Sequence, residues 1–242
     1  MFTFVRGWDF KKSELKPWLK KEWKIPPKAN DGFVWRMEEI LEVYKRPYDP
    51  QRPVICFDES SKQQIQEVIN SLPMKPGKAY RYDSEYKRNG VSNLFMIFEP
   101  LRGKRYVKVT DQRTKKDWAK CIKYIADELY PHVEKITVVM DNLNTHSPAS
   151  LYANFAPEEA RRLTEKVEIE YTPKHGSWLN MAEIEFSALS RQCLKERIGT
   201  QEELIKEVKA WEGERNSREV KCNWQFRTED ARIKLKSLYP VL

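Results

Sequence analysis

The chain has 242 residues, which is enough for one substantial hydrophobic core with at most a small appendage. It carries 44 Lys and Arg against 36 Asp and Glu, a net charge of +8, which favours a polyanionic partner. Four scattered cysteines and three histidines argue against a zinc site or a disulfide framework, and the sequence contains neither a secretory cleavage pattern nor a membrane-length apolar run. We therefore expect a cytoplasmic protein with no membrane partner.

The first fifty residues predict a small helical arm. Residues 11–24 form a basic, tryptophan-bearing segment with apolar residues at mostly helical spacing, and residues 31–45 carry a second apolar helical face. Prolines 47, 50 and 53 then mark an extended linker. We expect residues 1–50 to form an arm and linker that pack on the main domain, residues 51–242, or on another chain. The basic face of the arm either contacts nucleic acid or is simply solvated.

Two short apolar runs each end on an acid. Residues 138–146 read VVMDNLNTH, a buried strand that stops at Asp141, and residues 53–60 read PVICFDES, a second buried strand that stops at Asp58 and Glu59. Ligands of open sheets bind beyond the carboxyl ends of the parallel strands, so acids at these positions indicate a site. The alternative is that Asp141 only caps a loop through its own backbone.

The two acids together indicate a metal. If the two strands are neighbours in one sheet, Asp58 and Asp141 lie close together, and like charges at that separation cannot both ionise cheaply without a cation. Magnesium binds through one or two carboxylates and keeps its other positions for water and phosphate, so it suits an all-oxygen pair better than zinc does.

The remaining pattern predicts an α/β domain. Residues 59–90 lack a strong pattern and end in the basic, turn-prone YKRNG. After them we expect a hairpin of strands 93–99 and 104–110 with the second strand at a sheet edge, a covering helix from Thr114 with a capping box to Asp117, and a strand at 167–171. Further helices are expected at 156–165, 200–215 and 229–238.

Residues 172–186, TPKHGSWLNMAEIEF, supply a third acid. A helix is expected to begin near Asn180, with Glu183 one step off its apolar stripe and Ser187 and Ser190 following on the same face. These small side chains leave room for an ion and a phosphate. The alternative is that Asn180 and Glu183 only form a capping box. Glu185 is a rival acid, but we expect it on the polar side of the helix.

Together, CFDES, VVMDNLNTH, KRNG, NLFMIFEP and TPKHGSWLNMAEIEF resemble the DDE transposases of bacterial insertion sequences in the Tc/mariner superfamily. The likeness extends from about Ser13 to Pro240. It implies an RNase H-like fold, a mixed sheet flanked by helices, with an acidic triad of Asp58, Asp141 and Glu183. It further implies two Mg²⁺ ions, for which Mn²⁺ substitutes, and a reaction that cuts DNA at the element's ends and joins the freed 3′-hydroxyl to target DNA.

The same resemblance implies a homodimer on DNA and a nucleoid-associated protein. Residues that flank the acids are candidates to hold DNA phosphates, and they are Asn142, His146, Lys174, His175, Ser177 and Asn180. His146 and His175 are equally suited to structuring their loops through hydrogen bonds.

The chain departs from the family in two respects. Helix-turn-helix domains normally precede the catalytic core, and only the short arm does so here. The spacing from Asp141 to Glu183, with 41 residues between them, is also longer than the family's usual spacer. Two other functions therefore stay open. One is an RNase H-like nuclease that cuts without joining, and the other is a non-enzymatic DNA-binding remnant of a truncated transposase.

Overall fold

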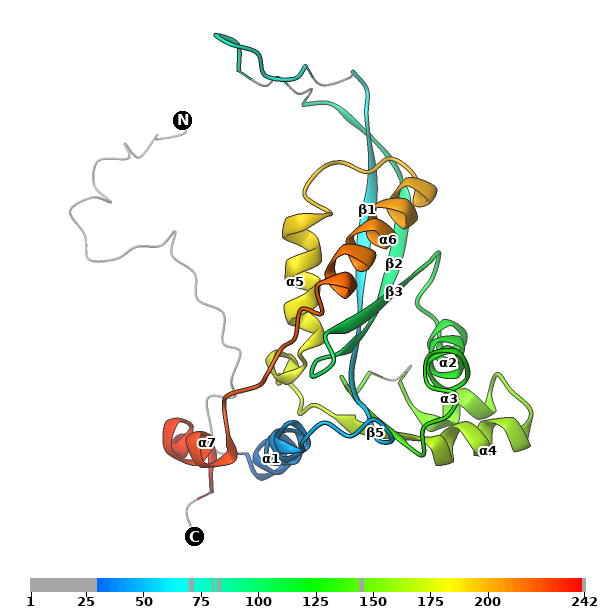
Figure 1. The fold of residues 1–242 in the computed structure, drawn as a ribbon, viewed down its shortest axis with the longest axis vertical. Coiled ribbons are helices and arrows are strands. Elements are labelled where there is room, and N and C mark those ends of the chain that lie inside the picture. Colours follow the sequence, from blue (N-terminus) through cyan, green and yellow to red (C-terminus); the bar gives the residue numbers. More distant parts are fainter. Residues whose placement is uncertain (1–29, 70–71, 80, 82–83, 144–145, 241–242) are drawn as a thin grey trace, which may run out of the picture.

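The computed structural model describes residues 30–69, 72–79, 81, 84–143 and 146–240 (Figure 1). The helix expected at residues 11–24 lies outside these residues. The elements follow in the order α1 (Asp31–Lys45), β1 (Val54–Glu67), β2 (Tyr86–Glu99), β3 (Lys104–Thr110), α2 (Lys115–Tyr124), the π-helical η2 (Ile125–Leu129), β4 (Ile136–Met140), α3 (Pro148–Tyr152), α4 (Pro157–Lys166), β5 (Val167–Tyr171), the 3₁₀ turn η3 (Ser177–Leu179), α5 (Ala182–Gln192), α6 (Gln201–Ser217), α7 (Thr228–Lys234) and the 3₁₀ turn η4 (Lys236–Leu238).

The strands form one mixed sheet in the order β3-β2-β1-β4-β5. The first three strands pair antiparallel, whereas β4 pairs parallel with both β1 and β5. The predicted hairpin is confirmed, and β3 lies at the sheet edge as expected. The expected parallel pair of acid-bearing strands is confirmed as well, because β1 and β4 are neighbours.

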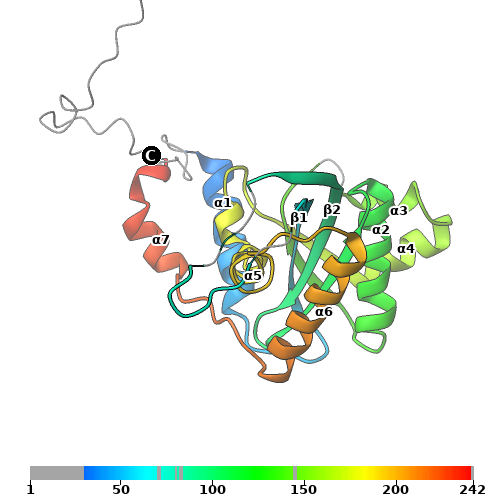
Figure 2. The ribbon, with the colours of Figure 1, turned by 90° about the horizontal axis from the view of Figure 1, so that it is seen from above.

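Side-chain alternation along β1 divides the core into two layers. Ile55 and Phe57 pack with the helices α2, α3 and α4, whereas Cys56 faces the opposite layer with α1, α5 and α6. Figure 2 shows these two helical layers on either side of the sheet. Helix α1, which the sequence assigns to an N-terminal arm, shares the core of this second layer. Within the described residues, no helix is both long and apolar enough to cross a bilayer.

Two predicted helix starts carry the capping interactions that their sequences indicate. Thr114 accepts a hydrogen bond from the Asp117 N–H, and the Asp117 carboxylate accepts one from the Thr114 N–H at 2.9 Å, which completes the capping box of α2. Thr200 accepts from the Glu203 N–H at 3.2 Å at the start of α6. Each cap satisfies backbone donors that have no partner inside the helix.

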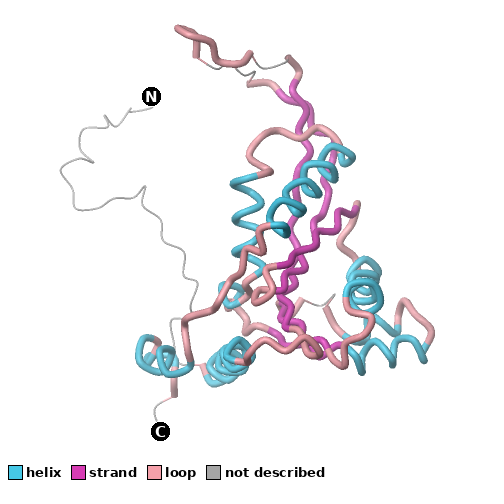
Figure 3. The backbone as a smooth tube through the Cα atoms, in the orientation of Figure 1, coloured by secondary structure: helices cyan, strands magenta, loops and turns pink. Residues whose placement is uncertain are grey.

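Residues 59–90 differ from the expectation of a patternless segment. Here β1 continues to Glu67 and β2 begins at Tyr86, so the two strands form a long hairpin that projects from the body (Figures 1 and 3). The YKRNG segment is therefore part of a strand. It holds a β-bulge, where the register shifts and Gly90 adopts φ +115°. This extension contacts the segment after α5 through polar groups, since the Ile65 N–H donates to the Ile198 carbonyl at 2.8 Å and the Asn89 amide donates to the Gly199 carbonyl at 2.9 Å. Its sequence therefore lacks the apolar alternation that marks a half-buried strand.

Helix α6 covers the free edge of β3. Asn216 accepts from the Arg105 N–H at 2.8 Å and donates to the Arg105 carbonyl at 2.7 Å, so its side chain pairs with the strand as a neighbouring backbone would. The Glu212 carboxylate accepts from the Val107 N–H at 2.7 Å. An open sheet edge invites pairing with other chains, and these contacts close it.

Gly103 in the β2–β3 turn provides a test of this docking. Its φ is +69°, and an added Cβ would lie 2.6 Å from the Glu219 backbone that follows α6. We expect Gly103→Ala to destabilise the fold by about 2 kcal/mol or more, through backbone strain and the clash. Urea unfolding measures this change. Gly213→Ala is the matched control, because a Cβ there meets nothing within 4 Å in α6, and it should leave stability equal or higher. Equal effects of the two substitutions would contradict the prediction.

Candidate active site

Strand register brings Asp58 and Asp141 together. The parallel pairing of β1 and β4 ends at Cys56 opposite Val139, and each acid lies two residues beyond its member of this pair. Neighbouring strands are about 4.8 Å apart, so the two acids stand side by side at the carboxyl end of the parallel strands. The strands that carry the two acids are thus neighbours, and the catalytic role of the acids stays a prediction.

Glu183 lies in the first turn of α5, which packs on the same face of the sheet as Cys56. The start of this helix is attached next to Asp58, because the Asn180 amide donates to the Phe57 carbonyl at 2.9 Å. The capping box that sequence analysis kept as an alternative does not form. The Asn180 N–H donates to the Ser177 carbonyl at 2.7 Å instead, and the Glu183 side chain remains exposed.

The three acids share one electrostatic environment. Burial, together with the charges of Glu183, Asp141 and Glu59, raises the pKa of Asp58 to about 7, although a hydrogen bond from the Glu59 N–H lowers it. The carboxylates are not already gathered around a common point, since no group of three His, Cys, Asp or Glu side chains among the described residues is arranged to hold a metal. Mutual repulsion keeps like charges apart.

His146 joins two of the acidic side chains. Its Nδ1 lies 2.7 Å from Asp141 Oδ1 and its Nε2 lies 2.7 Å from Glu59 Oε2, while the ring itself is fully buried beside Trp118 and Phe57. Burial alone would lower the pKa of His146, but the hydrogen bonds that its ring donates to Asp141 and Glu59 outweigh this effect and raise the pKa to about 9. His146 is therefore a cation that fixes Asp141 against the sheet.

These contacts correct two of the expected phosphate ligands. Both ring nitrogens of His146 are used by carboxylates, so the imidazole has no donor left for a phosphate. Asn180 is 1 % exposed, and its amide donates to Phe57 while its oxygen accepts from the Ala182 N–H. Both residues shape the site from beneath its surface, and for His146 the loop-structuring alternative describes the structure.

The other candidates lie at the surface of the same sheet end. Asn142 follows Asp141 and is exposed, and Lys174, His175 and Ser177 are exposed in the loop after β5. This loop starts beside Asp141, because β5 pairs with β4 up to Tyr171 opposite Met140. His175 lies in a tight turn with φ +64°, a backbone conformation that is uncommon for residues other than glycine.

Sequence reasoning missed the roles of two acids. Glu59 stands next to Asp58 but points to the opposite face of the sheet, where it binds His146. The alternation of side chains along β1 could have shown this direction. Glu185 was expected on the polar side of its helix, yet it is 3 % exposed and ion-paired with two arginines. Its arginine partners, on distant elements, leave no local signal.

A groove of about 800 Å³ lies between the C-terminal end of α5 and α6, bordered by Gln192, Trp211 and Arg215. Its lining includes none of the three acids. The candidate site is thus identified by converging carboxylates and not by cavity volume, as suits an extended substrate that binds across a surface.

Three structures of Mos1 transposase resemble the chain in fold. The Mos1 mariner paired end complex with Mn matches with a TM-score of 0.55 at 13% sequence identity, and the match covers 87% of this chain and 64% of that chain. A pre-cleavage Mos1 transpososome matches with a TM-score of 0.58 at 12% identity, over 96% and 69% of the two chains. The catalytic domain of Mos1 mariner transposase matches with a TM-score of 0.52 at 12% identity, over 81% and 90%.

The fold expected from the resemblance, an RNase H-like mixed sheet flanked by helices, is thereby confirmed. A comparison with curated proteins gives no match. The family model described as "DDE superfamily endonuclease" matches residues 53–205, a range that holds all three acids. The chain therefore belongs to the DDE superfamily endonucleases.

Proposed function

We propose that the chain is the catalytic part of an insertion-sequence transposase, in which Asp58, Asp141 and Glu183 are the catalytic, metal-binding residues. The observation that carries the proposal is the convergence of these acids from β1, β4 and α5 into one electrostatic site within a DDE endonuclease domain. The fold's likeness to Mos1 complexes that contain transposon ends, and to a Mos1 strand transfer complex, supports it.

The donor set suits Mg²⁺, with Mn²⁺ as a substitute. All three side chains offer oxygen. Burial, with the charges of Glu183, Asp141 and Glu59 added, raises the pKa of Asp58, and a cation would stabilise its ionised form. Two bound cations would activate the attacking oxygen and stabilise the leaving oxygen of a phosphodiester displacement. The chain's own residues hold the ligands in place: Asp58 through its strand, Asp141 through His146, and Glu183 through α5. Mos1 structures with Mn and with Mg are among the similar folds.

We expect the DNA partner to approach the sheet end where Asn142, Lys174, His175 and Ser177 are exposed. A cation and several polar groups there match phosphates. Because an element has two ends, each of which must be cut, a homodimer on DNA suits the reaction, with element-end and target DNA as its substrates. Because its proposed substrate is DNA, we expect the protein to lie in the cytoplasm with the nucleoid.

The test combines purified protein, Mg²⁺, a target plasmid and DNA that carries the ends flanking the coding sequence. Cleavage at the ends followed by their joining to the plasmid is expected. Glu183→Gln should abolish both steps while DNA binding, measured by mobility shift, persists. Cutting without joining would favour the nuclease, and binding with neither step would favour the non-enzymatic remnant.

A further inference from the structure

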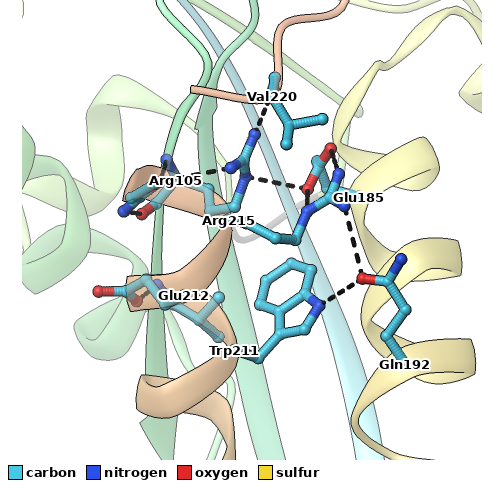
Figure 4. Close-up of polar contacts among 9 residues, drawn as sticks. Arg105, Glu185, Gln192, Trp211, Glu212, Arg215 and Val220 are labelled. Atoms are coloured by element: carbon cyan, nitrogen blue, oxygen red, sulfur yellow. Dashed lines mark hydrogen bonds and ion pairs between the residues drawn. The ribbon is translucent and has the colours of Figure 1, made fainter. Parts of the chain in front are cut away.

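A buried ion-pair network links three elements behind Glu183. The Glu185 carboxylate lies 3.0 Å from Arg105 Nε on β3 and 2.8 Å from a terminal guanidinium nitrogen of Arg215 on α6 (Figure 4). Arg105 is fully buried and also donates to the Val220 carbonyl at 2.6 Å. One carboxylate of α5 thus joins the edge strand and the neighbouring helix.

The end of α5 is held by the same helix. Gln192 Oε1 accepts from Trp211 Nε1 at 2.9 Å, and Arg215 Nη1 approaches the same oxygen at 3.4 Å. Gln192 lies seven residues after Glu185, two turns along the same face of α5. Figure 4 shows the contacts of α5 at both Glu185 and Gln192. Because these contacts are two turns apart, they fix both the rotation and the tilt of the helix.

Such a network needs an explanation other than stability. A buried ion pair seldom stabilises a fold more than apolar side chains of similar size, because removing the charges from water offsets their attraction. Burial lowers the pKa of Arg105, which shows the strain of placing its charge there. What the pair with Arg215 adds is a defined geometry, because its guanidinium donates to both Glu185 oxygens, at 3.1 and 2.8 Å, and such forked contacts allow few orientations.

The geometry matters most for Glu183. Among the described residues, no hydrogen bond or ion pair of its own holds the Glu183 side chain, so its place is set by the backbone of α5. That backbone is attached at Asn180, three residues before, and at Glu185, two residues after. We propose that Glu185, with Arg105 and Arg215, is a positioning residue: it fixes the α5 backbone from which Glu183 reaches a metal ion shared with Asp58 and Asp141. This inference rests on the proposed function.

The test measures metal affinity apart from turnover. Mn²⁺ binding to the full chain is titrated by electron paramagnetic resonance, and the Mg²⁺ dependence of end cleavage is measured in parallel. Glu185→Gln removes the charge at constant volume, and we expect it to weaken Mn²⁺ binding about tenfold or more, as loss of a group that orients a metal ligand typically does. Glu185→Asp keeps the charge and should recover part of the affinity.

Two further variants keep the test decisive. Arg215→Lys retains a charge at a partly exposed position but loses the forked contact, so it should weaken Mn²⁺ binding even if Glu185→Gln does not fold. Tyr130→Phe is the control, because it removes a buried 2.6 Å hydrogen bond to Glu99 in the other layer. It should cost stability without changing Mn²⁺ affinity.

The outcomes separate the two proposals. Wild-type affinity in Glu185→Gln and Arg215→Lys overturns the positioning role while leaving the proposed function intact. A Tyr130→Phe protein that loses as much affinity as these variants overturns it too, because general loosening would then be the cause. If the wild-type chain binds no Mn²⁺ and cuts no DNA, the proposed function fails and the positioning role falls with it.

Discussion

Replacing Asp58 with Asn is expected to abolish end cleavage while making the metal-free protein more stable at neutral pH. The carboxylate is held in a largely buried position near Glu183, Asp141 and Glu59, whose charges add to the effect of burial and raise its pKa to about 7 from an ordinary 3.8. An amide fills the same space without the charge. The catalytic loss should exceed about a thousandfold, since the proposed metal site would lose one of its three carboxylate ligands, and DNA binding should persist.

The pH dependence has a definite sign. With a folded-state pKa of about 7 and an unfolded value near 3.8, the folded protein holds the Asp58 proton more tightly, so stability falls as pH rises between these values. Converted to free energy, this pKa shift sets an upper bound of about 4 kcal/mol on the stability gained by Asp58→Asn. In urea unfolding at pH 8 with a chelator, we expect the variant to be about 1–3 kcal/mol more stable than the wild type. At pH 4 the variant and the wild type should differ little.

Two controls accompany this measurement. Mg²⁺ should raise the stability of the wild type, because a ligand that binds only the folded state stabilises that state. The difference in stability between Asp58→Asn and the wild type should then become smaller. Glu183→Gln should abolish cleavage without the gain in stability, since that side chain is exposed. An Asp58→Asn protein no more stable than the wild type at pH 8 would contradict a raised pKa of Asp58 in the folded protein.

The acids on the sheet were predictable because two simple rules place them. A buried parallel strand is marked by its continuous apolar run, and parallel strands end at the same edge of a sheet. Asp58 and Asp141 therefore lie at the same sheet edge although 82 residues of sequence stand between them. Glu183 needed the resemblance to DDE transposases, because N-x-x-E spacing alone is equally typical of a capping box.

What could not be predicted depends on partners distant in sequence. The helical pattern marks Glu185 only as a charged residue, and its burial follows from Arg105 on the edge strand and Arg215 on α6. The projecting hairpin lacks an apolar pattern because its contacts with the segment after α5 are hydrogen bonds of backbone and polar side chains. The role of His146 also depends on a residue distant in sequence. Its ring binds a carboxylate of the protein and not a phosphate because Glu59 points from β1 toward it.

His146→Ala is expected to destabilise the fold by about 3–5 kcal/mol, the typical cost of removing one partner from a buried charge pair. The substitution leaves the Glu59 carboxylate, which is 6 % exposed, without its cation and frees Asp141 from its 2.7 Å contact. Cleavage should fall as well, because Asp141 loses its fixed orientation. Adding Glu59→Gln should recover part of the stability, since the stranded charge is then removed.

The pH profile of the wild type distinguishes this effect from that of Asp58. Burial disfavours the charged imidazole, but the hydrogen bonds that it donates to Asp141 and Glu59 raise the pKa of His146 to about 9 from an ordinary 6.5. A raised histidine pKa contributes stability that is fully present below the unfolded value and is lost as pH rises through the folded one. Wild-type stability should therefore decline between about pH 6.5 and 9, mostly above the pH range in which Asp58 titrates.

His146→Ala should abolish this decline, whereas His132→Ala, at an exposed loop position, should retain it. A decline that survives in His146→Ala would place the titrating group elsewhere and would remove the evidence that a charged His146 holds Asp141.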